Sequence, residues 1–426
     1  MLRLRPAATL LRRSIRLGTG AARWSASQPA AGGGISPLQA VGGMAAAAVI
    51  GVGVGLYLPT GGAPAAPSTS AEPPAADSEP KEARRRSSVY EDVEDIADEI
   101  ERPAMIRDAS RSEVEALYEF QSLMASGGSA AVWRAVERAT GRAVAIKVID
   151  KKLLLPSLLN MEVYAMQRCS GHPNIAALLA AFDLPPDEAS PDGEWHLVME
   201  LAEGGELFER LLQHGAYTEK VASDLLKQIA SAVYHLHSCG VTHRDIKPEN
   251  IVLMSDDEAA PVKLIDFGAA LVLEEGEQVI RGGKVGTWTY WAPELADEDV
   301  PYDQAVDMWG LGVVLYIMLS GRHPFEKARA SADDVLQGIL DANYSFDSDA
   351  WNGVSGRAKE LVARMLEKDP EKRMTAAELL SHSWVRGERV PERPLPDTQE
   401  RLRAFKKATT AIHASLLLAV LLHQDS

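Results

Sequence analysis

The chain is poor in cysteine and in positive charge. Its 426 residues include two cysteines, Cys169 and Cys239, and its 44 lysines and arginines are outnumbered by 60 acidic residues, giving a net charge of −16. So few cysteines exclude a disulfide framework and a cysteine-based zinc site, and they fit a reducing compartment. The acidic balance excludes the cationic surface that nucleic acids require, so we expect no nucleic-acid partner. A hydrophobic content of 46% excludes a wholly disordered protein.

Acidic residues are absent from the first 71 positions, which carry six arginines and no lysine. Residues 1–37 place apolar side chains between these arginines, so they can form a basic amphipathic helix and resemble an organellar transit peptide. The density of arginine favours a mitochondrial address, with a plastid as the alternative. A disordered basic tail is the competing interpretation, because composition alone defines such signals.

Charge is also absent from residues 38–58, which as a helix would rise about 31 Å and match the hydrocarbon core of a bilayer. Alanine and glycine supply most of this apolar character, which makes the hydrophobicity marginal. The segment predicts a single transmembrane anchor, with an Ala/Gly-rich transit extension as the alternative.

Residues 59–88 are rich in proline, alanine and serine and cannot bury a core. Residues 89–101 hold seven acidic side chains and predict either a solvated amphipathic helix or an acidic tether. We therefore expect residues 59–115 to be a disordered linker. Ser87 and Ser88 each follow an arginine by three positions. They are candidate phosphorylation sites, although this pattern arises equally well by chance in an arginine-rich linker.

Residues 116–385 have a different character, since β-branched runs come first and long helical patterns follow. This order predicts an α+β architecture with a small strand-rich part and a large helix-rich part. Four short motifs occur in order within it: VAIK at 144–147, HRDIKPEN at 243–250, DFG at 266–268 and APE at 292–294.

These four motifs resemble those of a eukaryotic protein kinase. The resemblance implies a bilobal fold, with a small β-rich N-lobe and a large helical C-lobe, and ATP and Mg²⁺ as cofactors. Lys147 is then expected to hold the α- and β-phosphates while paired with Glu162, for which a plain surface charge is the alternative. Asp245 would accept the proton of the substrate hydroxyl, and Lys247 would steady the transferred phosphate.

The same resemblance assigns the remaining site residues. Asn250 and Asp266 would supply oxygen ligands to Mg²⁺. The adenine would lie against backbone groups of the linker 196–201 and between apolar walls, with Met199 at the back of the pocket or simply in the strand core. The expected ATP-binding residues are Ala125, Gly127, Val132, Ala145, Lys147, Glu162, Met199, Glu200, Leu201, Glu206, Leu253 and Asp266.

The expected phosphate-covering loop departs from the kinase pattern. Only Gly127 occupies a glycine position of that pattern, whereas alanines stand at 125 and 130. Alanine forbids some of the conformations that glycine adopts near a phosphate, so ATP affinity would fall. This departure supports the alternative function, a membrane-tethered pseudokinase that acts as a nucleotide-binding scaffold.

Longer segments, among them AEGGELFERL and DIKPENIVL, resemble the calcium/calmodulin-dependent protein kinase group. The resemblance implies a protein substrate with a serine or threonine acceptor. Glu206 with Glu249 would bind an arginine upstream of it, which gives an R-x-x-S/T preference. In structural roles, Asp307 would anchor the catalytic loop and Arg373 would pair with Glu294.

The expected activation segment includes Phe267, Gly268, Thr287 and Glu294, but it lacks serine, threonine and tyrosine from 269 to 285. No phosphorylation switch can lie in that stretch. We expect a carboxylate among residues 274, 275 and 277 to face Arg244 in place of a phosphate.

The C-terminal tail, residues 386–426, is expected to be regulatory. Within it, residues 400–422 combine basic side chains with the apolar anchors Phe405, Ile412 and Leu418, and resemble the autoinhibitory, calmodulin-binding segment of the same group. Docking on the chain's own domain and contact with a membrane surface are the alternatives.

Overall fold

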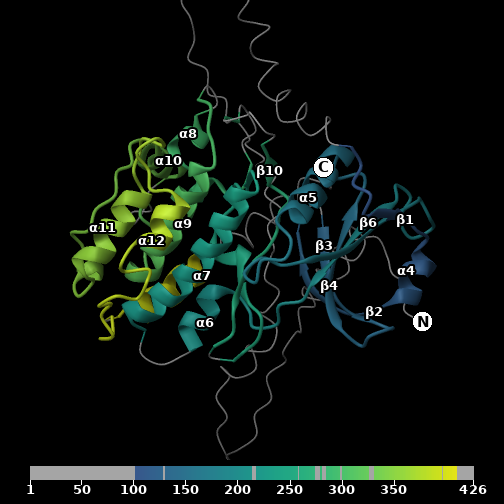
Figure 1. Cartoon of the computed structure of the whole chain (residues 1–426), viewed down its shortest axis with the longest axis horizontal. Coiled ribbons are helices and arrows are strands. Elements are labelled where there is room, and N and C mark those ends of the chain that lie inside the picture. Colours follow the sequence, from purple (N-terminus) through teal and green to yellow (C-terminus); the bar gives the residue numbers. More distant parts are fainter. Residues whose placement is uncertain are drawn as a thin grey trace, which may run out of the picture.

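The computed structural model describes residues 101–409, apart from 128–129, 214–216, 258, 274–278, 281–284, 298–299, 326–330 and 396. The predicted transit peptide, the predicted membrane anchor, Ser87 and Ser88 therefore lie outside the described residues. Within the described part, no helix is long and apolar enough to cross a membrane. The strands gather in one lobe and most helices in the other, as Figure 1 shows.

The N-lobe is built on one six-stranded sheet with the strand order β1-β5-β6-β4-β3-β2. Its strands are β1 (Ile106–Asp108), β2 (Tyr118–Ser126), β3 (Ala130–Glu137), β4 (Ala143–Asp150), β5 (Leu178–Leu184) and β6 (Glu194–Glu200). All neighbouring strands are antiparallel except β1 and β5. Helix α5 (Pro156–Arg168) follows β4, and proline at its first turn suits a helix start because no backbone N–H is needed there.

Residues 106–115, which the sequence analysis placed in the linker, fold onto this sheet. Strand β1 extends it beyond β5, and helix α4 (Arg111–Leu117) begins at Ser110 with a capping box completed by Glu113. Val114 of α4 is fully buried in the sheet's core. Figure 1 places β1 and α4 at the outer end of the N-lobe.

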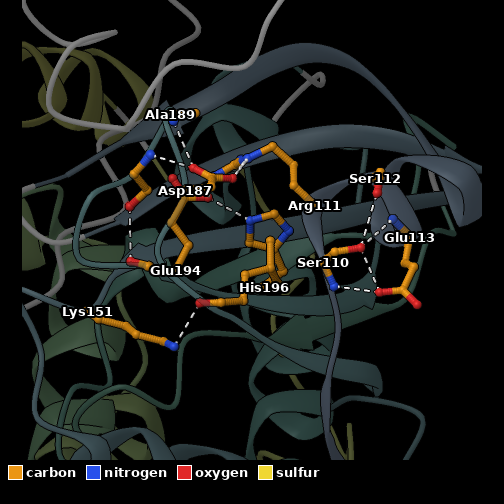
Figure 2. Close-up of polar contacts among 12 residues, drawn as sticks. Ser110, Arg111, Ser112, Glu113, Lys151, Asp187, Ala189, Glu194 and His196 are labelled. Atoms are coloured by element: carbon orange, nitrogen blue, oxygen red, sulfur yellow. Dashed lines mark hydrogen bonds and ion pairs between the residues drawn. The ribbon is translucent and has the colours of Figure 1, made fainter.

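Charged side chains fasten this N-terminal extension to the loop between β5 and β6 (Figure 2). The Arg111 guanidinium lies 2.7 Å from Asp187 Oδ2 and 3.1 Å from Glu194 Oε2. Glu194 Oε2 also forms a 2.9 Å hydrogen bond with Nε2 of His196. Glu194 and His196 are both buried, so Arg111 supplies the cation that their site requires.

The C-lobe packs around helix α9 (Ala305–Ser320), which is buried from Val306 to Ser320. This complete burial explains why its sequence is apolar on every face. The surrounding helices are α6 (Leu207–Gln213), α7 (Glu219–Ser238), α8 (Pro293–Ala296), α10 (Ala332–Leu340), α11 (Gly356–Met365) and α12 (Ala376–Ser381). Two short ladders lie toward the N-lobe: β7 (Val241–Thr242) with β10 (Leu271–Val272), and β8 (Ile251–Leu253) with β9 (Val262–Leu264).

Candidate active site

A buried lysine joins the two lobes. Lys147 on β4 donates to Glu162 Oε1 of α5 at 2.6 Å and to Asp266 Oδ1 at 3.0 Å. Burial alone would lower the pKa of Lys147, but attraction to Asp266 and Glu162 outweighs it and raises that pKa. The lysine therefore carries its charge in a site that excludes water, where it can neutralise phosphate oxygens.

The two carboxylates of this group differ in their electrostatics. Burial raises the pKa of Glu162, since Lys147 offsets it only in part. For Asp266 the burial cost is outweighed by Lys147, so its pKa is lowered and it stays ionised. Phe267, which follows it, is fully buried with its ring 5.1 Å from that of His243. This packing holds the Asp266 carboxylate toward Lys147.

The catalytic loop and the activation segment together fix both carboxylate oxygens of Asp245. Oδ1 accepts the backbone N–H of Thr287 at 2.8 Å, and Oδ2 accepts from Lys247 Nζ at 2.7 Å and from Asn250 Nδ2 at 3.0 Å. Lys247 Nζ also donates to Thr287 Oγ1 at 2.8 Å. Burial alone would lower the pKa of Lys247, but attraction to Asp245 outweighs this effect, so the net result is a raised pKa. A cation, a carboxylate and a hydroxyl thus meet at one point.

The oxygen donors expected for Mg²⁺ suit that ion. Asn250 Oδ1 is buried and has no hydrogen-bond partner among the described residues, while its Nδ2 is held by the backbone and side chain of Asp245. A buried carbonyl oxygen without a partner is costly unless a ligand fills the position. Together with the ionised Asp266, it forms the hard oxygen set that Mg²⁺ prefers.

The comparisons with known proteins agree with this geometry. A family model described as "Protein kinase domain" matches residues 118–385. The chain belongs to the protein kinase family. It is 39% identical over 285 residues to calcium/calmodulin-dependent protein kinase type 1B of Rattus norvegicus, covering 66% of this chain and 79% of that protein.

Other relatives fall in the same group. Myosin light chain kinase A of Dictyostelium discoideum is 37% identical over 278 residues, which cover 65% of this chain and 90% of that protein. Calcium-dependent protein kinase 15 of Oryza sativa is 40% identical over 302 residues, which cover 69% of this chain and 53% of that protein. The protein is therefore a serine/threonine kinase of the calmodulin-dependent kinase type, and it uses ATP and Mg²⁺. These predictions from the sequence are confirmed.

The geometry explains how the kinase can transfer a phosphoryl group. Bound Mg²⁺ supplies charge neutralisation on the phosphate oxygens. Lys147 is poised to hold phosphate oxygens from the N-lobe side, and Lys247 from the C-lobe side. Asp245 is oriented by three donors to accept a hydroxyl proton from a substrate. Each group is fixed before substrate arrives, which reduces the reorganisation needed in the transition state.

Asp307, at the start of α9, anchors the backbone of the catalytic loop, as expected. Its oxygens accept the backbone N–H groups of His243 at 2.9 Å and Arg244 at 2.8 Å, and it bonds His237 Nε2 at 2.9 Å. Burial alone would raise the pKa of Asp307, but the His237 hydrogen bond and nearby charge outweigh it and lower that pKa.

Arg373 and Glu294 form the expected pair. The guanidinium makes two parallel bonds to the carboxylate, at 2.5 and 3.0 Å, and both side chains are buried. The same guanidinium donates to the Ala305 and Glu367 carbonyls, which ties the end of the activation segment to the start of α9.

Apolar residues expected around the adenine assemble only in part. Ala125, Val132, Ala145 and Leu201 form one small buried cluster, to which strands β2, β3 and β4 contribute. Leu253 is buried in the large hydrophobic cluster that includes residues of both lobes, and Met199 packs against that same cluster. The first four therefore make the wall that the N-lobe and the linker contribute.

The interlobe linker begins later than the sequence indicated. Residues 196–200 are strand residues of β6, paired with β4 and β5, so their backbone groups serve the sheet. The side chain of Glu200 accepts from Lys263 at 2.7 Å, which is a structural contact. Of the range 196–201, Leu201 alone lies beyond the strand.

The phosphate-covering loop follows β2. Gly127 N–H donates to the Ala130 carbonyl at 2.8 Å, which joins the end of β2 to the start of β3; residues 128–129 lie outside the described part. Ala125 and Ala130 are both buried. The two alanines that replace glycine in the kinase pattern are thus covered by neighbouring side chains of the described part.

Three acidic side chains gather on the C-lobe near the catalytic loop, and the tail supplies their cation. Glu206, which precedes α6, lies 3.2 Å from Lys406 Nζ, and Glu209 of α6 lies 2.5 Å from it. Glu249 Oε2 is buried with no hydrogen-bond partner among the described residues. The sequence singled out Glu206, Glu249 and, among the basic residues of the tail, Lys406. It did not indicate Glu209 or the contact of Lys406 with these carboxylates, because contact between residues about 200 positions apart has no local signal.

Proposed function

We propose that this kinase phosphorylates serine or threonine three residues after an arginine, and that its C-terminal tail inhibits it by occupying the arginine site. The observation that carries the proposal is Lys406, whose ammonium group bridges Glu206 and Glu209. A substrate arginine offers the same charge on a side chain of similar length. Lysine from the tail and arginine from a substrate would therefore compete for one position.

The electrostatics of the acidic group support this competition. Burial raises the pKa of Glu206, and Lys406 opposes the shift. Burial also raises the pKa of Glu249, with Lys247 and Lys406 opposing. Clustered carboxylates in a partly dry site gain most from a nearby cation, because removing that cation leaves like charges facing each other.

The tail docks through more than this one lysine. Residues 398–409 are helical, Leu402 is fully buried, and the ring of Phe405 meets that of Phe208 edge-on at 6.2 Å. Gln399 and Arg403 donate to backbone carbonyls at the end of α6. A buried leucine and an aromatic contact place the tail firmly enough to hold Lys406 at the acidic site.

We further propose that calcium-loaded calmodulin releases this tail by binding residues 400–422. Several relatives carry calmodulin in their names, which supports the proposal. Phe405 is the first of the three expected anchors and is used in docking here, so the two states would compete for it. Ile412 and Leu418 lie outside the described residues.

The test compares Lys406→Ala with Lys407→Ala, a neighbouring exposed lysine, in the full chain. We expect Lys406→Ala to raise basal transfer to an R-x-x-S peptide by about 5- to 30-fold, as loss of a half-buried ion pair implies, while Lys407→Ala stays close to the parent. Equal rates for the two variants would refute inhibition by Lys406.

The arginine preference is tested separately. Glu206→Gln should raise the KM for an R-x-x-S peptide and leave the KM for a matched A-x-x-S peptide unchanged. A proportional rise for both peptides would refute the preference. A third comparison checks the release mechanism by calorimetry of calmodulin with the full chain and with its Phe405→Ala variant. If calmodulin does not bind the full chain, the release mechanism is contradicted.

The pseudokinase alternative is tested by transfer itself. Its support is the alanines at 125 and 130, and against it stand the assembled groups around Asp245. Incorporation of labelled phosphate by the Lys406→Ala variant, lost in the same variant with Asp245→Asn, would exclude a scaffold without activity.

For localisation we propose that residues 1–37 direct the kinase to mitochondria and that residues 38–58 anchor it in a membrane. The support is the acid-free, arginine-rich composition followed by 21 uncharged residues. A fusion of residues 1–71 to a fluorescent protein should enter isolated mitochondria and resist carbonate extraction. If the fusion protein enters mitochondria but carbonate releases all of it, the membrane anchor is refuted and the mitochondrial address is not.

A further inference from the structure

The arginine next to the catalytic aspartate has a tyrosine as its partner. Arg244 is buried, and its Nη1 donates to the phenol oxygen of Tyr302 at 2.9 Å. Its Nε donates to the backbone carbonyl of Ala269, at the start of the activation segment, at 2.6 Å. Both partners are neutral oxygens, one at the start of the activation segment and one beyond its end.

The backbone of Tyr302 also forms hydrogen bonds with the middle of the activation segment. The N–H of Ile280 donates to the Tyr302 carbonyl at 2.6 Å, and the N–H of Tyr302 donates back to the Ile280 carbonyl at 3.0 Å. Ile280 is fully buried and Tyr302 nearly so. One residue therefore connects residue 280 to Arg244, and through Arg244 to Ala269.

The position of Arg244 affects the position of Asp245 and of the end of the activation segment. It lies beside Asp245 with a left-handed φ of 64°, and the Cβ that a side chain would place at Gly286 lies 2.5 Å from the Arg244 carbonyl. The end of the activation segment thus packs directly on this backbone. A shift of Arg244 would disturb the bond between Thr287 N–H and Asp245.

The sequence independently indicates that Arg244 needs a partner other than a phosphate on residues 269–285. Residues 269–285 contain no serine, threonine or tyrosine, so a phosphate cannot be attached there to attract Arg244. Glutamates 274, 275 and 277 lie outside the described residues. The described contact that holds Arg244 across the segment is the phenol of Tyr302.

We propose that Tyr302 is a positioning residue for phosphoryl transfer, and that its hydroxyl and backbone hold the activation segment in its active conformation without a phosphate on residues 269–285. The side chain acts through Arg244, since it touches no reacting atom. Loss of the hydroxyl leaves the ring packing in place but removes an acceptor from a buried guanidinium, which loosens the loop that carries Asp245.

The test is Tyr302→Phe in the full chain, with Lys406→Ala present in every protein so that the tail does not mask the rate. We expect kcat to fall about 10- to 100-fold, as loss of a hydrogen bond to a charged group in the catalytic loop implies, and the KM for ATP to stay within about threefold. The matched control is Tyr316→Phe. That buried hydroxyl donates to Ser345 at 2.9 Å and has no contact with Arg244, so its removal should leave kcat unchanged.

A double-mutant cycle with Arg244→Lys separates positioning from general destabilisation. If Tyr302 acts through Arg244, the double variant should be no slower than Arg244→Lys alone. Phosphatase treatment of the parent should leave its rate unchanged. If the Tyr302→Phe variant unfolds at a much lower temperature than the parent, its kcat cannot be interpreted, and amide exchange in Arg244→Lys is measured instead. Faster exchange at residues 279–281 in that variant supports coupling between Arg244 and this part of the activation segment.

Three results would overturn the proposal: kcat within twofold of the parent in Tyr302→Phe, additive losses in the double variant, or exchange at 279–281 that Arg244→Lys leaves unchanged. Because all rates are measured on one peptide substrate, these outcomes do not depend on the proposed arginine preference or on calmodulin.

Discussion

Replacement of Arg111 by alanine should unfold the N-lobe at lower denaturant, because it removes the cation beside buried Glu194 and partly exposed Asp187. Arg111 is 15% exposed as a side chain, Asp187 32% and Glu194 2%. Losing one partner of a fully buried pair costs about 3–5 kcal/mol. Water reaches Asp187 and screens its share, so we expect about 2–4 kcal/mol. Alanine is at least as good a helix former as arginine, so α4 itself is not weakened.

The matched control is Arg138→Ala. Arg138 lies 3.0 Å from Glu119 with both side chains at least half exposed, so its loss should cost under about 1 kcal/mol. Urea unfolding of the full chain, followed by tryptophan fluorescence, gives both values, and a melting shift of several degrees should accompany the first. Equal, small losses in the two variants would show that residues 101–117 are not part of the folded lobe.

Three further outcomes are expected. Asp245→Asn should lower kcat by about 10²- to 10⁴-fold while isothermal titration shows ATP binding retained; an unchanged kcat would remove Asp245 from its role. Arg373→Lys keeps the charge but loses the two-pronged bond to Glu294, so urea unfolding should show a loss of about 2–4 kcal/mol, and a loss below 1 kcal/mol would contradict it. Burial lowers the pKa of His323 to about 4 from an ordinary 6.5. Between these values the unfolded chain binds a proton that the folded chain does not, so stability falls as pH drops from about 6.5 to about 4, by up to about 3 kcal/mol. His323→Gln should flatten the pH curve in that window, and parallel curves would refute this.

The resemblance carried by the HRDIKPEN motif singled out Asp245, Lys247 and Asn250 as site residues. Lys247 and Asn250 lie two and five positions after Asp245, and the structure brings all three side chains together in one loop. Long-range pairs such as Lys147 with Glu162 and Arg373 with Glu294 came from family resemblance, and the structure brings both together.

Features that depend on packing between distant segments were not predictable in this way. The acidic composition of residues 89–101 gave the whole stretch up to 115 the character of a linker, although Val114 and Arg111 find partners on the sheet. The linker between the lobes was placed too early because HLVME is apolar enough to be either strand or linker. Lys406 has no local pattern that indicates a partner at Glu206.

The backbone of the active site shows a further reason why sequence alone stops short. Arg244 and Asp266 adopt left-handed conformations, with φ of 64° and 60°, which cost non-glycine residues about 1–3 kcal/mol each. Glycine would relieve this cost but would remove the guanidinium and the carboxylate that the reaction needs. The strain is held instead by contacts from segments far away in the sequence: Asp307 accepts the Arg244 N–H, and Lys147 bonds Asp266. The motif residues can therefore keep their chemistry only because a buried helix and a sheet strand stabilise a conformation that they would not adopt alone.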